Sequence, residues 1–199
     1  MKEKYLNATM SFVTKYNSYS DEELENMRYG LEGLYLSITK LVILVIIALL
    51  LGIWKELFIL LVMFNIIRYP GFGFHARKSS ECLICSTLLF IGLPILLSYL
   101  NLSRLTLFII GVICTCLLAI YSPADTVKRP LPNKKKRMIR KIATTVMAIV
   151  YTLISFVINS YTISYLLIAS LILEAIMVNP LTYKIFKQPY RNYLNYQKT

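Results

Sequence analysis

The chain has 199 residues, of which 57% are hydrophobic and only 16% are charged. An apolar content this far above that of soluble domains excludes an ordinary soluble protein and predicts an integral membrane protein. The formal charge of +12 leaves nucleic acid, an anionic membrane surface and an acidic peptide as partners to consider, and the positions of the charges decide among them. The first 37 residues hold no apolar core followed by small residues, so we expect no cleavable signal peptide.

The N-terminal region, residues 1–37, is polar or mixed in character. Ser20-Asp-Glu-Glu23 has the pattern of a capping box and predicts a helix that starts there. A shorter mixed segment over 4–16 precedes it. Together they predict an amphipathic interfacial region that leads into the membrane. The predicted helix carries an apolar stripe at Leu24, Met27, Leu31, Leu34 and Ile38.

Apolar spans fill the middle of the chain. We place six of them, at 38–54, 56–67, 83–100, 105–121, 142–158 and 162–178. Since a full crossing needs about 20 residues, 56–67 is too short alone. It is either tilted, or continued by 69–74, or it forms a re-entrant hairpin with the first span, broken at 54–56.

These spans predict an all-α, polytopic membrane protein with about six transmembrane or re-entrant helices. We expect a single membrane-embedded domain over 1–199, with the helical bundle at 38–178 and a cytoplasmic tail at 179–199. No internal repeat or low-complexity linker divides the chain.

The charges fix the expected orientation. If both termini are cytoplasmic and all six spans cross, the outer loops hold only Lys55 and Arg104, and the other 20 of the 22 basic residues lie inside. Eight of these fall between Lys128 and Lys141. This is a strong positive-inside bias, and it survives if the first two spans form a hairpin. It also places His75 and Cys82 on the cytoplasmic side.

The basic loop has two interpretations. Such loops are usually only topology determinants, but they also bind anionic lipid or an acidic peptide. We expect no nucleic acid, because the Lys134–Arg137 run has no aromatic stacking partners and is tethered at the bilayer.

His75 is the only histidine, and it stands seven residues before Cys82 in a polar stretch between two spans. A neutral imidazole can take the proton of a thiol and create a nucleophile. Cys82 follows Ser79 and Ser80, either of which can cap a helix, and a cysteine in a first helical turn has a lowered pKa. The pair therefore indicates a cysteine protease at the membrane surface. The alternative is a structural histidine and a buried cysteine.

Other residues nearby could support the pair. Gly71 and Gly73 allow the close backbone approach that an oxyanion hole or a substrate groove needs, although they also suit an ordinary loop. Arg68 ends the second span, where a snorkelling topology anchor is the default interpretation. Asp125 could orient the imidazole as a third catalytic member, or it could simply cap a loop.

Metal, cofactor and ion-transport roles have little support. One Cys82-x-x-Cys85 pair and one histidine do not supply four metal ligands, so we expect no metal and no cofactor. Glu174 is the one carboxylate within a span, which makes an ion-coupled transporter a weak hypothesis.

Taken together, these motifs resemble the AgrB family, the accessory gene regulator membrane endopeptidases of Gram-positive bacteria. The resemblance covers nearly the whole chain. Its features are Arg68, Gly73-x-His75, Cys82, the Tyr29-Gly-Leu-Glu32 stretch, Pro123-Ala-Asp-Thr126 and the basic loop.

The resemblance implies processing of an AgrD-type quorum-sensing propeptide with an acidic C-terminal tail. Cys82 would attack the peptide bond before the tail, with His75 as general base, and the resulting thioester would close into a thiolactone or lactone. The alternative is a non-catalytic membrane protein that binds or exports a peptide. A homodimer would fit a protein of this kind, but no interface motif indicates it. On this interpretation the tail binds Lys128, Arg129, Lys134, Lys135, Lys136 and Arg137.

Overall fold

The structure is a computed structural model that describes residues 2–15, 19–74, 79–126 and 130–196. The described residues are overwhelmingly helical and contain no strand, which confirms the all-α prediction. They divide into two compact units, Met1–Leu50 and Leu51–Thr199. Each unit is described by itself.

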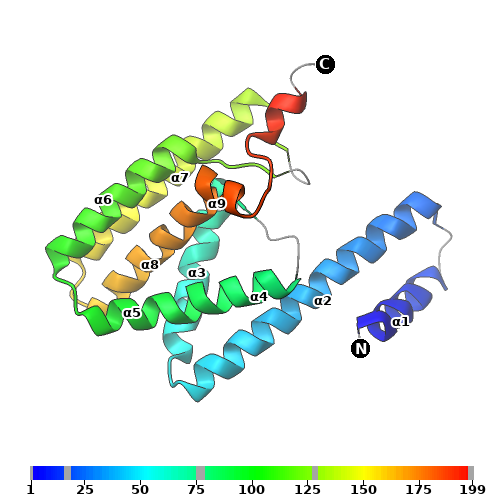
Figure 1. Cartoon of the computed structure of the whole chain (residues 1–199), viewed down its shortest axis with the longest axis horizontal. Coiled ribbons are helices and arrows are strands. Elements are labelled where there is room, and N and C mark those ends of the chain that lie inside the picture. The colour runs from blue at the N-terminus through cyan, green and yellow to red at the C-terminus, as the bar shows by residue number, and fades with distance from the viewer. Residues whose placement is uncertain (1, 16–18, 75–78, 127–129, 197–199) are drawn as a thin grey trace. The chain divides into compact units, whose positions relative to one another are not determined.

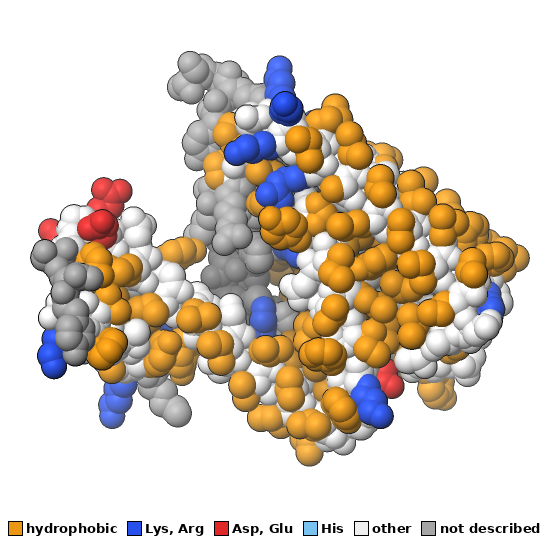
Figure 2. All heavy atoms as spheres, turned by 180° about the vertical axis from the view of Figure 1, so that it is seen from behind, with side chains coloured by type: hydrophobic (Ala, Val, Ile, Leu, Met, Phe, Trp, Pro, Cys, Tyr) orange, Lys and Arg blue, Asp and Glu red, His pale blue; other side chains and the backbone are white. Residues whose placement is uncertain are grey.

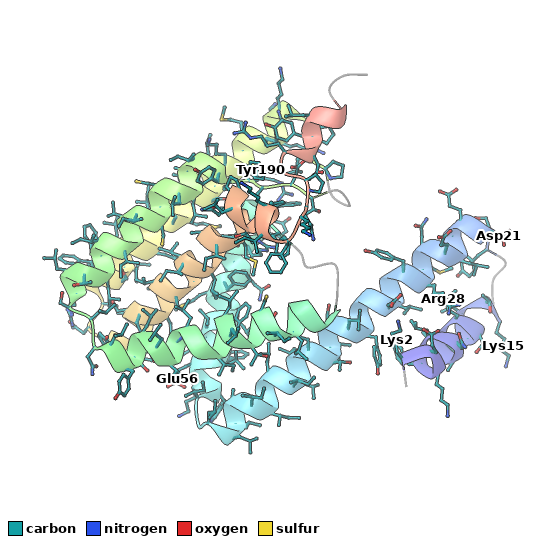
Figure 3. The ribbon with its side chains drawn as sticks, viewed as in Figure 1. Lys2, Lys15, Asp21, Arg28, Glu56 and Tyr190 are labelled. Carbon is teal, nitrogen blue, oxygen red and sulfur yellow. The ribbon has the colours of Figure 1, made fainter. Side chains whose placement is uncertain are left out.

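The first unit consists of α1 (Lys2–Thr14) and α2 (Asp21–Leu50). The capping box is present, since the Ser20 backbone N–H donates to Glu23 Oε2 at 2.9 Å and the Glu23 N–H donates to Ser20 Oγ. Two cross-helix ion pairs join α1 to α2, Lys2–Glu32 at 2.6 Å and Arg28–Glu3 at 3.0 Å. Figure 3 labels Lys2 of α1 and Arg28 of α2. The described N-terminal residues therefore form a helical hairpin, and their amphipathic, interfacial character stays a prediction.

The second unit holds the remaining helices (Figure 1). They are α3 (Trp54–Gly71), α4 (Ser79–Thr87), the π-helical segment η1 (Leu88–Gly92), α5 (Leu93–Leu100), α6 (Arg104–Tyr121), α7 (Lys134–Val157), α8 (Tyr161–Val178), α9 (Pro180–Ile185) and the 3₁₀ turn η2 (Asn192–Tyr196).

Helix α8 is the centre of this unit. It is apolar around its whole circumference, the pattern of a helix surrounded by others. It packs against α3, α5, α6 and α7, and 67% of its residues are buried, against 22% for α6. Packing is tight at Gly111 of α6, where a Cβ would lie 2.9 Å from side-chain atoms of both Ile168 and Thr152.

The predicted span at 83–100 is one helical path with a π-helical turn in its middle. Pro94 explains the irregularity. Proline lacks an N–H, and its ring clashes with the carbonyl four residues earlier, so the preceding turn widens. Within the widened turn, the Leu93 N–H bonds the Leu88 carbonyl, five residues back.

Five described helical stretches are long and apolar enough to cross a membrane, namely α2, the 83–100 path, α6, α7 and α8. The second predicted span appears as α3, which continues beyond residue 67 through Pro70 to Gly71, giving 18 residues. It carries Lys55, Glu56 and Arg68 near its ends. Whether α2 and α3 cross separately or form a re-entrant hairpin stays a prediction.

Hydrophobic side chains also cover the outside of the second unit (Figure 2). On α7, for example, Ile142, Val146 and Leu153 are each more than half exposed. A surface of this kind requires an apolar solvent, as in a bilayer. Lys and Arg side chains gather at the end of the unit where α6 ends and α7 begins (Figure 2), which is the pattern of a multi-pass membrane protein with one basic side.

Candidate functional site

The two residues of the predicted catalytic pair lie at the limit of what is described. His75 is outside the described residues. Cys82 is the fourth residue of α4, which begins at Ser79, so the prediction that it stands in a first helical turn is confirmed. The side chain of Cys82 is outside the described part, and contact between the pair stays a prediction.

The segment that immediately precedes His75 is held by three backbone hydrogen bonds to two other parts of the chain. The Gly73 N–H donates to the Ala124 carbonyl at 2.7 Å, and the Ala124 N–H donates to the Gly71 carbonyl at 3.1 Å, which forms a short parallel bridge. The Phe74 N–H donates to the Met177 carbonyl at 2.8 Å. The end of α3 is thereby joined to the segment after α6 and to the end of α8.

Both glycines of this segment are required by close packing. A Cβ on Gly71 would lie 2.2 Å from Glu174 Oε1. A Cβ on Gly73 would lie 2.3 Å from Arg68 Nη1 and 2.8 Å from the Met177 carbonyl oxygen, and the φ of Gly73 is +111°, in the range that favours glycine. The close backbone approach predicted for these glycines is present, while an oxyanion role stays a prediction.

Arg68 is not the snorkelling anchor that was the default interpretation. Its side chain is 14% exposed and turns inward, with Nη1 3.4 Å from Oε2 of Glu174, which is fully buried. Its Nη2 donates to the carbonyl of Phe74 at 2.7 Å, the residue before His75. Arg68 therefore supports the segment that leads into the predicted catalytic loop. The other Glu174 oxygen, Oε1, has no hydrogen-bond partner among the described residues.

Asp125 is 2% exposed and binds the C-terminal segment. Its carboxylate accepts backbone N–H groups of Asn192 at 2.9 Å, Tyr193 at 2.7 Å and Leu131 at 3.4 Å. Burial raises the pKa of this carboxyl, and the three N–H bonds oppose that shift. The described contacts give Asp125 a loop-tethering role, and orientation of His75 stays a prediction.

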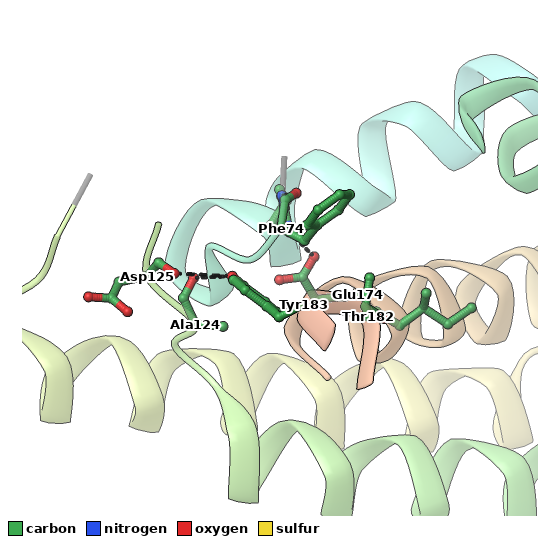
Figure 4. Close-up of polar contacts among 8 residues, drawn as sticks. Phe74, Ala124, Asp125, Glu174, Thr182 and Tyr183 are labelled. Atoms are coloured by element: carbon green, nitrogen blue, oxygen red, sulfur yellow. Dashed lines mark hydrogen bonds and ion pairs between the residues drawn. The ribbon is translucent and has the colours of Figure 1, made fainter. Parts of the chain in front are cut away.

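Tyr183 connects these parts. Asn179 caps α9, accepting the Leu181 N–H at 2.9 Å, and the helix places the Tyr183 hydroxyl where it donates to the carbonyls of Ala124, at 3.3 Å, and Asp125, at 3.1 Å (Figure 4). The Phe74 ring packs edge-on against Tyr183, with centroids 6.0 Å apart. Burial raises the pKa of Tyr183 well above its ordinary value, so its hydroxyl stays a donor.

The basic loop is described in part. Lys128 and Arg129 lie outside the described residues. Lys134, Lys135 and Lys136 form the exposed first turn of α7, where the helix dipole disfavours cations and favours an anionic partner.

Arg137 has an aromatic stacking partner, contrary to the expectation from the sequence. Its guanidinium lies 3.7 Å from the centroid of the Tyr193 ring, and Nη1 donates to the carbonyls of Leu131 and Pro132. The statement that the basic run has no aromatic stacking partner is therefore wrong. The sequence does not reveal this contact, because Tyr193 reaches Arg137 only when the C-terminal segment folds back.

Glu174 is the residue at this site whose role sequence reasoning missed. The signal was available, because an ionisable residue within a span is expected to pair with another. Arg68, a basic residue at the end of an apolar run, is of the type that could pair with Glu174, although the sequence analysis did not pair them. The sequence does not show that these two positions, 106 residues apart, lie side by side.

Comparison with known proteins identifies the family of this chain. The sequence profile of the family described as Accessory gene regulator B matches residues 6–178. The chain is 31% identical over 177 residues to a putative AgrB-like protein of Clostridium acetobutylicum, covering 89% of this chain and 85% of that protein. It is 28% identical over 188 residues to a putative AgrB-like protein of Listeria monocytogenes serovar 1/2a, covering 93% and 91%.

A third relative is the Accessory gene regulator protein B of Staphylococcus aureus strain MW2, 28% identical over 173 residues, with coverage of 87% and 91%. No solved structure matches the chain. The profile match spans most of the chain, and the relatives are matched over most of their own length. The chain therefore belongs to the accessory gene regulator B (AgrB) family of multi-pass membrane proteins.

Proposed function

We propose that this chain, whose family implies a role in the agr quorum-sensing system, is a membrane cysteine endopeptidase acting on an AgrD-type propeptide. The observation that carries the proposal is the fixation of Phe74. Its N–H bonds the Met177 carbonyl, and its own carbonyl accepts from Arg68. The chain thus enters the His75 position from a held backbone, and Cys82 follows in the first turn of α4. A backbone held in this way would help to position the proposed pair for nucleophilic catalysis.

In the proposed reaction, His75 takes the proton of the Cys82 thiol. The thiolate attacks the carbonyl carbon of the peptide bond before the acidic tail, the C–N bond breaks, and the imidazolium protonates the departing amine. A nucleophile within the propeptide then attacks the thioester carbonyl, the C–S bond breaks, and a cyclic thiolactone or lactone leaves with the thiol regenerated. A thioester retains much of the activation of its acyl group, so a held internal nucleophile can compete with water.

Support for the pair comes from residues around it. Arg68 and Gly73 hold the segment before His75, and Asp125 tethers the loop that bridges to Gly73. We place both termini and the site on the cytoplasmic side. The acidic tail would be bound by the basic loop, through Lys128, Arg129, Lys134, Lys135, Lys136 and Arg137.

Co-expression with the short, acidic-tailed peptide encoded beside the gene tests this function. Mass spectrometry should show loss of the tail and a product one water lighter than the linear cleaved peptide. Cys82→Ala should leave the precursor intact, and the matched control Cys85→Ala, three residues along the same helix, should process it. Equal cleavage with Cys82→Ala would remove Cys82 from the mechanism. An intact precursor bound by every variant would favour a peptide-binding or export protein.

A further inference from the structure

A cleft of about 360 Å³ opens where α6 ends and α7 begins. Its walls come from the last residues of α6, the 122–125 segment, the first two turns of α7 and residues 190–193. Four cations line it, Lys134, Arg137, Lys141 and Arg191. The one acidic residue that lines it, Asp125, has its charge engaged by three backbone N–H groups. The cleft is therefore suited to an anion.

Ser122 belongs to the wall of this cleft. The residue is 4% exposed, and its Oγ has no hydrogen-bond partner among the described residues. Buried hydroxyl groups in folded proteins are almost always paired, since an unmade hydrogen bond is costly. Because this Oγ is itself shielded from solvent, the binding of an anion in the cleft rests on the four cations.

An apolar groove adjoins the cleft, so a ligand that fills both needs an apolar part as well as an anionic group. The groove, of about 260 Å³, lies between α6 and α7 and is lined by Ala119, Ile142, Thr145 and Val146. It shares Met138 and Lys141 with the basic cleft. Basic cleft and apolar groove therefore form one continuous amphipathic surface at the end of two membrane-spanning helices.

We propose that this surface is a binding site for an anionic phospholipid, with the phosphate in the basic cleft and an acyl chain in the groove. Lys141 lies at the junction, where its stem can cover the chain while its ammonium reaches the phosphate. A peptide fits the groove less well, since backbone amides placed against these apolar side chains would lack partners. The cleft shares Lys134 and Arg137 with the cations proposed for the propeptide tail, and it contains neither His75 nor Cys82. Of the cations proposed for the propeptide tail, Lys135 and Lys136 lie outside the cleft.

Native mass spectrometry of the purified full-length chain, released from detergent micelles, tests the site. We expect the wild type to retain one phosphatidylglycerol molecule and not to retain phosphatidylcholine. Lys141→Gln should weaken retention roughly tenfold, the loss that one charge-assisted hydrogen bond brings. Arg191→Gln removes a cation outside the helices, so it tests the site even if Lys141→Gln folds poorly. Lys135→Gln, with the same charge change on α7 outside the cleft, should retain lipid like the wild type.

Two further arms separate the sources of the anion. Inorganic phosphate and a synthetic acidic peptide are added in place of lipid, and thermal unfolding is measured. Stabilisation by phosphatidylglycerol alone supports the proposal. Equal stabilisation by inorganic phosphate would show a phosphate site without an acyl subsite. Binding of the acidic peptide in place of the lipid, or equal losses in Lys135→Gln and Lys141→Gln, would overturn the lipid assignment.

Discussion

Arg68 and Glu174 form a buried ion pair that joins α3 to α8. The two charges differ in how far other groups also pair them. Arg68 also bonds the Phe74 carbonyl, so its charge is partly engaged without Glu174. Glu174 relies on Arg68 and keeps one oxygen without a described partner. Breaking a buried pair from one side leaves an uncompensated charge, whereas replacing both residues by apolar ones removes the problem.

We therefore predict that Glu174→Met and Arg68→Met each destabilise the chain by about 3–5 kcal/mol. The double variant should lose less than the sum of the two. Thermal unfolding in detergent, arranged as a double-mutant cycle, measures the coupling. Arg104→Met, at the exposed start of α6, is the control and should have little effect. Additive losses would contradict an energetic pairing of Arg68 with Glu174.

Gly71 gives a second prediction, because its surroundings leave no room for a side chain. Gly71→Ala would place a Cβ against Glu174 Oε1 and displace the segment that leads to His75. We expect a loss of about 1–3 kcal/mol in unfolding free energy, typical of overpacking, together with slower propeptide processing. Gly92→Ala is the matched control, since nothing lies within 4 Å of the added Cβ. Equal effects of the two substitutions would show that the contact is not limiting.

At the level of elements, the apolar pattern predicted the helices well and their ends less well. The capping box located the start of α2, and the serines at 79 and 80 located the start of α4. The π-helical turn before Pro94 was not predicted, whereas the extension of α3 to Gly71 was one of the alternatives left open for the second span. These depend on how a backbone accommodates proline and on bonds to Ala124 and Met177, which are distant in the sequence.

Asp125 joins the 122–125 segment to η2, and we expect its contribution to stability to depend on pH. Burial raises the pKa of Asp125 above its ordinary value of 3.8, so the folded chain holds this proton more tightly than the unfolded chain. The resulting contribution to stability is complete below the unfolded pKa and is lost as the pH rises through the folded pKa. We expect wild-type unfolding temperature to decline over that window relative to Asp125→Asn, which cannot titrate. Parallel pH profiles of the two proteins would contradict this.

At the scale of the whole molecule, charge and hydropathy predicted the fold class but not the contacts between distant residues. Long apolar stretches dictate helices in a bilayer, because every backbone polar group must be satisfied within the span. The distribution of basic residues then predicts an orientation. What the sequence could not give is the convergence of α3, the 122–125 segment, the end of α8 and the C-terminal residues around Gly73. That arrangement depends on contacts across more than 50 residues of sequence.

The predicted orientation has one element whose crossing is open to a direct test, the α2–α3 connection. In a variant lacking native cysteines, single cysteines replace Lys55, Arg104 or Lys135, and intact cells are treated with a membrane-impermeant maleimide. Because Arg104 precedes α6 on the predicted outer side, Arg104→Cys should label, and Lys135→Cys should label only after permeabilisation. If α2 and α3 cross separately, Lys55→Cys labels like Arg104→Cys. If they form a re-entrant hairpin, it labels in neither condition while the other two keep their pattern, and labelling of Lys135→Cys in intact cells would reverse the orientation altogether.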